Sequence, residues 1–281
     1  MTRSAAPSKA AWPLEAALFH FSTRDRTFGT DPFKYDAELR EKARRTPPPR
    51  PTRREKGPVH PLPRAADAGP VLNVLLQRRT NRRFSRSPVS GEALASLLSA
   101  TWGVQKWGRV EGQGRVALKT SPSAGARHPL EAYVIVRRVN GVRSGAYHFD
   151  AASHELVRLG GAPRQKRLAH MLGNQWFFAD AAVIVFMVAV FERTWWRYPN
   201  SRAYRTVLID AGHLGQTFCL VATALNLAPF TTMAFVEREV ENLFALDKHR
   251  ESPMYVVGVG SPVPASESPG RIPRRSRDHH R

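Results

Sequence analysis

Residues 120–136 read TSPSAGARHPLEAYVIV and combine the two signals that decide the fold. The second half, LEAYVIV, is rich in β-branched and aromatic residues, which predicts a strand. The first half carries almost no side-chain bulk before the pair Arg127 and His128. Small residues let the main chain approach another molecule, and glycine adds backbone conformations that a Cβ forbids. We therefore expect a bare loop that lies against a flat ring or a phosphate, with an ordinary tight turn as the alternative.

The segments around this loop predict further helices and strands. Upstream, helices are expected over 71–79 and 90–103, the second with Ser90 as its N-cap and Gly103 as its stop. Downstream, the pattern predicts a hairpin over 145–159, a helix over 163–172, a buried strand over 181–191, a long helix over 201–227 and a strand over 253–260. Strands and helices in this order predict an α+β fold.

The long helix carries two glycines in its interior. Apolar residues recur close to every 3.6 positions over 201–227. Gly212 and Gly215 reduce helix stability at such positions. We therefore expect another backbone or a ligand to approach this helix closely.

The two ends of the chain differ in composition from its centre. Half of the 22 prolines lie in residues 1–70, so this Pro-rich, basic N-terminal extension cannot form one continuous helix or sheet. Within it, LEAALFHFSTRD (14–25) has enough apolar residues to dock as a short helix. Residues 261–281 read as a basic tail that we expect to be disordered. Residues 71–260 are then the folded domain.

The composition narrows the classes of partner and site. The 43 basic and 23 acidic side chains give a net charge of +20, which raises nucleic acid or an acidic partner as candidates. The excess is spread along the chain, and no basic helix is interleaved with aromatics, so we do not expect nucleic acid. Cys219 is the single cysteine, which excludes an intramolecular disulfide and a CxxC site. We expect no metal.

The sequence also predicts no membrane span. The longest apolar run, 181–191, is far shorter than the roughly 20 residues that a span needs. The N-terminus lacks an apolar signal core. We expect a soluble, cytoplasmic protein.

An arginine cluster follows the first expected core helix. In QRRTNRRF (77–84), four arginines surround Thr80. Like charges so close together repel, and a bound anion would relieve the repulsion. A phosphate matches the forked donors of arginine, and the Thr80 hydroxyl adds one more hydrogen bond. A solvated basic turn is the alternative.

Several motifs in order resemble the nitroreductase-like FMN oxidoreductases. They are RRTNRRF, SPSAGARHPLEAYVIV, GAYHFD, RAYRTVLIDAGHLGQ and PMYVVGVG, and they span roughly 71–260. More narrowly, the chain resembles SagB/ThcOx-type dehydrogenases, which include azoline oxidases of peptide natural-product pathways. The resemblance implies an α+β fold with a mixed or antiparallel central sheet flanked by helices. It also implies a domain-interlocked homodimer with FMN at the subunit interface.

The resemblance assigns cofactor-binding residues. The positions that match the FMN phosphate and ring edge are Arg78, Arg79, Thr80 and Arg82. Those that match the loop beside the isoalloxazine are Ser123, Ala124, Gly125, Ala126 and Arg127, and Gln216 matches the helix near the cofactor. Arg127 would stabilise the negative charge of a reduced flavin. We therefore expect the arginine cluster and the bare loop to converge on opposite ends of one planar, phosphorylated coenzyme.

The resemblance also supplies candidate catalytic residues, with one departure. The family's azoline oxidases carry a Lys-Tyr pair before the long helix, and this chain has Arg197 and Tyr198 there. Arginine does not lose its proton in proteins, so Arg197 cannot be the base. Tyr198 can be the base if the neighbouring charge lowers its pKa. His213 is a third candidate, with a structural role on a packed helix as the alternative.

The function implied is an FMN-dependent dehydrogenase. A base would take one proton from a peptide thiazoline or oxazoline while a hydride passes to the flavin, and aromatisation would drive the reaction. A peptide substrate and a cyclodehydratase partner are then expected. Two alternatives stay open, an NAD(P)H-dependent nitro or quinone reductase and a flavin-free scaffold that partners a peptide-modifying enzyme.

Overall fold

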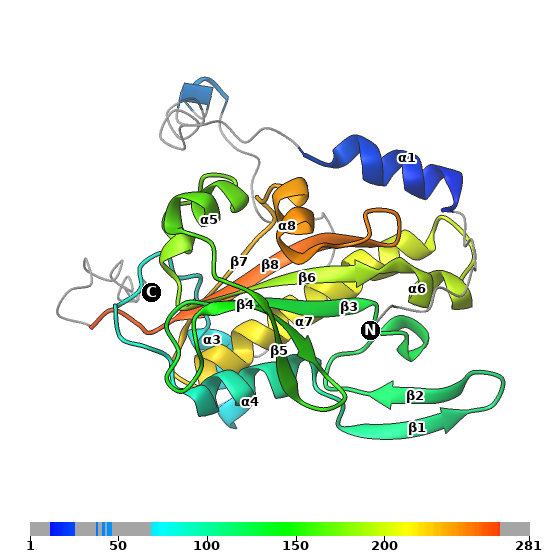
Figure 1. Cartoon of the computed structure of the whole chain (residues 1–281), viewed down its shortest axis with the longest axis horizontal. Coiled ribbons are helices and arrows are strands. Elements are labelled where there is room, and N and C mark those ends of the chain that lie inside the picture. The colour runs from blue at the N-terminus through cyan, green and yellow to red at the C-terminus, as the bar shows by residue number, and fades with distance from the viewer. Residues whose placement is uncertain (1–11, 26–37, 39–40, 43, 47–68, 265–281) are drawn as a thin grey trace, which may run out of the picture.

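The fold is built on a six-stranded antiparallel sheet with helices on both faces (Figure 1). The computed structural model describes residues 12–25, 38, 41–42, 44–46 and 69–264. The strand order is β5-β4-β3-β6-β8-β7. Their bounds are β3 Leu130–Val136, β4 Gly145–Asp150, β5 Glu155–Gly160, β6 Val183–Val190, β7 Ala228–Thr232 and β8 Glu251–Gly260. The predicted α+β class is confirmed, and the predicted basic tail, 261–281, lies largely outside the described residues.

The central strand β6 explains the apolar run that the sequence shows. Its neighbours are β3 and β8. Val183, Val185 and Met187 pack into the core on one face, and Ile184 and Phe186 pack into the core on the other. A strand buried on both faces needs consecutive apolar residues in place of alternation.

The helices divide between the two faces of the sheet (Figure 1). One face packs against α4, Gly91–Trp102, and α7, Ala203–Ala224. The other packs against α5, Gln165–Met171, and α8, Glu237–Phe244. The predicted cap of α4 is present, since Ser90 Oγ accepts a hydrogen bond from the Ala93 amide at 3.0 Å. A short helix, α3 at Gly69–Gln77, lies beside α7.

Four features have no counterpart in the sequence expectations. They are the hairpin of β1 (Lys106–Val110) and β2 (Gly114–Leu118), the helix α6 (Phe191–Arg197), β7 and α8. The hairpin is mostly exposed, so it lacks a buried apolar alternation. The predicted strand over 181–191 ends one residue early, because Phe191 begins α6. Short elements of this kind depend on their neighbours more than on their own pattern.

The two glycines of α7 have different surroundings. A β-carbon at Gly215 would lie 2.7 Å from the ring of Tyr255 on β8, so close approach of the sheet explains this glycine. A β-carbon at Gly212 would meet nothing within 4 Å. Among the described residues, α7 is the one helix long and apolar enough to cross a membrane, yet it packs against α4, β7 and β8 inside the fold. A cytoplasmic location stays a prediction.

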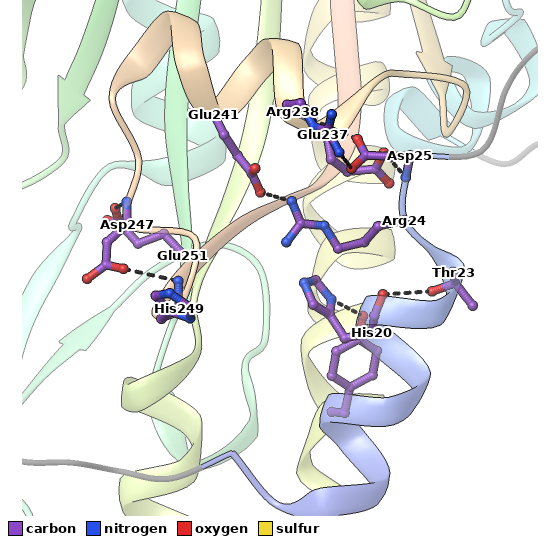
Figure 2. A network of polar contacts seen from close by, with 11 residues as sticks. His20, Thr23, Arg24, Asp25, Glu237, Arg238, Glu241, Asp247, His249 and Glu251 are labelled. Atoms are coloured by element: carbon purple, nitrogen blue, oxygen red, sulfur yellow. Dashed lines mark hydrogen bonds and ion pairs between the residues drawn. The ribbon is translucent and has the colours of Figure 1, made fainter.

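The predicted N-terminal helix is present as α1, Leu14–Thr23, and packs onto the core. Trp12, just before it, lies 4.5 Å from the Trp195 ring by centroid. His20 is buried and its Nδ1 lies 3.0 Å from Tyr204 Oη. Figure 2 shows Arg24, after the helix, paired with Glu241 of α8. Residues 12–25 of the N-terminal extension are therefore integral to the fold.

We expect His20 to make the protein less stable as the pH falls from 7 to 5. Burial, and second the charge of Arg24, lower the pKa of His20 to about 4. Between that value and the ordinary value near 6.5 the unfolded chain binds a proton that the folded chain does not, so stability decreases with falling pH. Denaturant unfolding at both pH values should show wild type losing about 2 kcal/mol more than His20→Gln.

Comparison of wild type with His20→Gln separates the effect of His20 from that of groups whose titration changes stability in the opposite direction. Burial raises the pKa of Asp210, Glu237 and Glu241, and these groups favour the folded state as the pH falls. They are present in both proteins, so their contribution cancels. His170→Gln, at an exposed position of α5, controls for the loss of a histidine. The same pH dependence in wild type and His20→Gln would contradict the assignment.

Candidate active site

The bare loop before β3 contains three residues in the left-handed region. Gly125, Ala126 and His128 have φ angles of 59°, 52° and 43°. Glycine adopts such angles freely, whereas residues with a β-carbon do so rarely. The short helix η1, Ala124–Ala126, is the turn that results. The amides of Ala126 and Arg127 donate to the carbonyl oxygens of Ser123 and Ala124, as in a tight turn, and contacts with the rest of the fold hold this geometry.

A buried carboxylate on α7 anchors the loop. Ser123 Oγ donates to Asp210 Oδ2 at 2.5 Å, and the Ala124 amide also donates to Asp210. Burial raises the pKa of Asp210, and these two hydrogen bonds oppose that effect. Ser123 Oγ also accepts from the His128 amide at 2.9 Å. Asp210 was not predicted from the sequence, although a carboxylate within the buried stripe of an amphipathic helix is a signal that could have identified it.

His128 fixes the far end of the loop as a neutral ring. Burial lowers the pKa of His128 to about 4, and the charge of Lys119 contributes in the same direction. The ring is therefore neutral near pH 7. Its Nε2 lies 3.0 Å from the carbonyl oxygen of Ala117 and must donate to it. Arg193 donates to the His128 carbonyl oxygen at 3.0 Å, so the loop is tied to both the hairpin and α6.

The candidate catalytic pair lies directly on the loop. A β-carbon at Gly125 would lie 2.9 Å from Tyr198 Oη and 3.4 Å from Arg197 Cγ. The Tyr198 amide donates to Thr194 at 2.9 Å as α6 ends. Arg197 Cζ lies 5.6 Å from the centroid of the Tyr198 ring. The fold thus brings the two residues from α6 to the loop, where only a glycine leaves room for the phenol.

Arg127 turns back along the loop. Its Nε donates to the Gly125 carbonyl oxygen at 2.8 Å, and its guanidinium carbon lies 5.1 Å above the ring of Trp196. Trp196 is 59% exposed, whereas Trp195 is buried and stacks on Phe191. The two tryptophans therefore separate into a core residue and a surface residue beside the loop.

His213 and Gln216 lie on α7 next to this region. His213 Nδ1 lies 3.2 Å from the Pro122 carbonyl oxygen, so the ring supports the start of the loop. One turn further, Thr217 and Ser121 share a hydrogen bond of 2.6 Å between their hydroxyls. Gln216 is exposed on the same helix.

The arginine segment, residues 77–84, lies near the C-terminal half of α7. The Asn81 amide donates to the Pro229 carbonyl oxygen at 2.9 Å, which ties the segment to β7. Arg79 donates to the Leu76 carbonyl oxygen at 2.9 Å and closes the end of α3. Burial raises the pKa of Cys219 on α7 to about 11, and the nearby charge of Arg78 opposes this effect. Cys219 is buried, as the sequence predicted.

The cluster has charge available for a ligand. Its four arginines form no ion pair with a carboxylate among the described residues, and Thr80 is exposed beside them. The members of the cluster are Arg78, Arg79, Arg82 and Arg83. Most of them are exposed. A phosphate would meet donors that no acidic side chain already occupies.

The loop and the arginine cluster do not meet within one chain. The loop contacts α7 at Asp210, and the arginine segment lies near α7 at Cys219. Nine residues are two and a half helical turns, so Asp210 and Cys219 lie on opposite sides of the helix, although the start of the loop also reaches Thr217 through Ser121. Among the described residues no hydrogen bond or ion pair joins the loop to the arginine cluster, and their convergence on one coenzyme stays a prediction.

Comparison with known proteins places the chain in a family. The Nitroreductase family model matches residues 75–261. A relative named "Putative nitroreductase MJ1384", from Methanocaldococcus jannaschii, is 34% identical over 191 residues that cover 68% of this chain and 90% of the relative. The trifolitoxin-processing protein TfxB of Rhizobium leguminosarum bv. trifolii is 31% identical over 140 residues. That match covers 48% of this chain and 38% of the length of TfxB.

Solved structures share the fold at lower identity. One is a chain of the E. coli microcin synthetase McbBCD complex with truncated pro-MccB17 bound, which matches with a TM-score of 0.54 and 17% identity. The match covers 89% of this chain and 97% of that chain. The family match extends over most of the folded part, from the arginine cluster through the bare loop to the last strand. This chain belongs to the nitroreductase family.

Proposed function

We propose that this chain is an FMN-dependent dehydrogenase that removes two hydrogens from a thiazoline or oxazoline ring of a ribosomal peptide. One observation carries the proposal. Tyr198 and Arg197 meet the bare loop at Gly125, where a β-carbon would lie 2.9 Å from the Tyr198 hydroxyl. Tyr198 can transfer a proton and Arg197 is a permanent cation, and both border a loop with almost no side-chain bulk.

The residues present fit the flavin that nitroreductase-family proteins use. When bound, FMN supplies a two-electron acceptor. The backbone of 123–127 offers the low-bulk surface proposed for the ring, and the cluster at 78–83 offers the donors proposed for the phosphate. His213 and Gln216 lie between these segments along α7. The residues proposed to bind FMN are Arg78, Arg79, Thr80, Arg82, Ser123, Ala124, Gly125, Ala126, Arg127 and Gln216.

Two side chains have distinct proposed roles in the oxidation. The ring loses a proton from one atom and a hydride from its neighbour, and the product ring is aromatic. Tyr198 is proposed to accept the proton in its deprotonated form, which becomes the neutral phenol as the ring loses the proton. Arg197 keeps its own proton and is proposed to hold positive charge beside the phenol, from which its Cζ is 5.6 Å by ring centroid.

Peptide natural-product proteins among the relatives support a peptide substrate. TfxB is named for trifolitoxin processing, and the McbBCD complex was solved with truncated pro-MccB17 bound. We propose a peptide substrate and a cyclodehydratase partner for this chain on that ground. The 71–260 segment is proposed as the catalytic domain, and the family match over 75–261 supports that division.

A homodimer is proposed to complete the FMN site. α3 buries none of its side chains and exposes four large apolar residues, which are Val71, Leu72, Leu75 and Leu76. α7 exposes Leu208 and Ile209, at 37% and 56%. An apolar surface of this kind on neighbouring helices favours association. In one chain the loop and the arginine cluster border opposite sides of α7. A second copy bound to this face can bring its loop to the arginine cluster of the first.

Complementation between two defective variants tests the shared site. Arg78→Gln/Arg82→Gln removes phosphate donors, and Asp210→Ala releases the loop. We expect each variant alone to lose about tenfold or more of its FMN affinity, since hydrogen bonds to charged groups contribute about 1.5–3 kcal/mol. A heterodimer isolated with two different tags has one intact site if the site is shared. It should bind about half the FMN of wild type, measured by flavin fluorescence.

A site within one chain predicts a different result. Each chain of the heterodimer would then carry a defect, and FMN binding would stay at the level of the single variants. Wild-type chains carrying the same two tags control for the tags. A failure to isolate any heterodimer, with monomeric wild type in sedimentation, would count against the homodimer itself.

An NAD(P)H-dependent nitro or quinone reductase is a second candidate. The observation that favours it is the 34% identity with MJ1384 across 90% of that relative. One anaerobic experiment separates the candidates, in which the yellow protein is mixed with NADPH or with a thiazoline peptide. Rapid bleaching by NADPH supports the reductase, and bleaching by the peptide supports the dehydrogenase. A protein that stays colourless after reconstitution with FMN would support the scaffold alternative.

A further inference from the structure

A cavity of about 970 Å³ opens on the side of the loop that faces away from α7. Ser123 and Ala124 bind Asp210 of α7, whereas Arg127 and His128 line the cavity. Its other walls come mostly from the β1–β2 hairpin, α6 and strands β3, β4 and β5, with one residue each from β6, α8 and β8. None of the arginines between 78 and 83 lines it. The cavity is therefore separate from the proposed phosphate site.

The floor of the cavity is the outer part of the sheet. Tyr133, His148 and Val157 lie opposite one another on β3, β4 and β5. α5 and α8 pack against the inner strands on this face, but Val157 and Leu159 of the edge strand stay 47% and 48% exposed. An extended polypeptide can place apolar side chains on such a surface beside a strand edge.

The carboxylates of the cavity are already engaged. Glu131 pairs with Arg193 at 2.5 Å and with His148 at 2.9 Å. Burial raises the pKa of Glu131, but these two partners outweigh it and bring the pKa to about 2. Asp150 accepts from the Ala152 amide at 2.8 Å. Because these carboxylates already have partners within the protein, they do not favour the binding of a cationic ligand.

Three other cations in the cavity are less closely engaged, although the charge of Glu131 attracts the ammonium of Lys119. Lys119, Arg115 and Arg127 form no ion pair with a carboxylate among the described residues, although all three line the cavity. Arg115 Cζ lies 3.9 Å above the ring of Trp107, and Arg127 lies above the ring of Trp196. The arrangement offers three positive groups and two exposed aromatic rings to one space.

We propose that this cavity binds an acidic stretch of the peptide substrate, with the peptide carboxylates at Lys119 and Arg115 and with Arg127 at the border between the cavity and the loop. The inference rests on the proposed function, since it takes the substrate to be a peptide. Apolar side chains of the same stretch would contact Val157 and Leu159. The loop then separates two sites, the flavin side at α7 and a holding site for the peptide.

The charges in the cavity favour a peptide over a dinucleotide. Glu131, Asp150, Glu192 and Glu251 line the same space as the three cations. A diphosphate carries its negative charges together and would meet these carboxylates, whereas an acidic peptide separates its carboxylates with neutral residues. NADPH binding in this cavity is therefore an outcome that the test must detect.

Fluorescence anisotropy with two labelled peptides tests the proposal. The probes are a repeating glycine-glutamate-leucine-serine peptide and its twin with glutamine for glutamate. We expect the glutamate peptide to bind about tenfold tighter at low salt, with the difference shrinking as salt rises. Lys119→Gln/Arg115→Gln should remove about tenfold of that affinity. FMN content, measured on the same samples, should stay at the wild-type level.

Lys106→Gln/Arg109→Gln is the matched control, because it removes the same two charges. Lys106 and Arg109 are exposed on β1 of the same hairpin and do not line the cavity. Equal losses in the two double variants would overturn the proposal, because overall charge would explain both. Equal binding of the two peptides would also overturn it, as would displacement of the peptide by NADPH. Peptide binding without FMN binding would refute the proposed function and leave this site standing.

Discussion

Gly125→Ala is expected to lose about a hundredfold of turnover while the chain still folds. The φ of Gly125 is 59° and the added β-carbon would lie 2.9 Å from Tyr198 Oη. Left-handed backbone costs a residue with a β-carbon about 1–2 kcal/mol, and the phenol must move away from the loop. Displacement of the proposed proton acceptor removes a contribution of about 10²–10⁴ in rate. The measurement is oxidation of a thiazoline peptide, with unfolding in urea on the same samples.

Gly141→Ala separates backbone strain from displacement of the phenol. Gly141 has a φ of 76°, and a β-carbon there would meet nothing within 4 Å. We expect a similar loss of stability with unchanged turnover. Gly125→Ala/Tyr198→Phe should regain part of the stability, because the hydroxyl is gone, and should stay inactive. Matching turnover in Gly125→Ala and Gly141→Ala would exclude Tyr198 from the reaction.

Arg24→Ala should produce the largest loss of stability, about 3–5 kcal/mol. Arg24 pairs with Glu241 of α8, and their side chains are 10% and 1% exposed (Figure 2). Removal of the guanidinium leaves a carboxylate buried without its cation. Burial already raises the pKa of Glu241, against the effect of Arg24. The measurement is the free energy of unfolding in urea near neutral pH.

An exposed ion pair on the same helix is the control. Arg167 on α5 pairs with Glu239 of α8 at 3.1 Å, with side chains 49% and 30% exposed. Arg167→Ala should change stability by less than about 1 kcal/mol. Arg24→Met/Glu241→Leu should recover most of the loss, because it removes both charges. Similar effects of Arg24→Ala and Arg167→Ala would show that α1 does not depend on the buried pair.

The main elements were predictable because their signals are local. The apolar run at 181–191 requires a strand buried on both faces, and the 3.6-residue period at 201–227 requires a helix with one buried face. Ser90 and Gly103 mark the ends of α4 in the sequence as in the structure. The hairpin at 106–118 was missed because exposed strands lack an apolar alternation. β7 was missed because a five-residue strand depends on its partner β8.

The site residues divide in the same way. The bare loop and the arginine cluster are visible in the sequence because their composition is unusual. Asp210 was missed, since its role depends on a loop 87 residues away in the chain. The approach of Tyr198 to Gly125 likewise follows from the angle at which α6 leaves β6. The three unpaired cations of the cavity are ordinary basic residues until the fold places them together.

The sequence by itself determined the α+β class, the family and the stretches that would face a ligand, because periodicity and composition act over a few neighbouring residues. Tertiary structure alone decided which of those stretches meet. It put Tyr198 on the loop, and it set the arginine cluster and the loop on opposite sides of α7. Such distances arise from the packing of whole helices on a sheet, in which each contact depends on many residues at once.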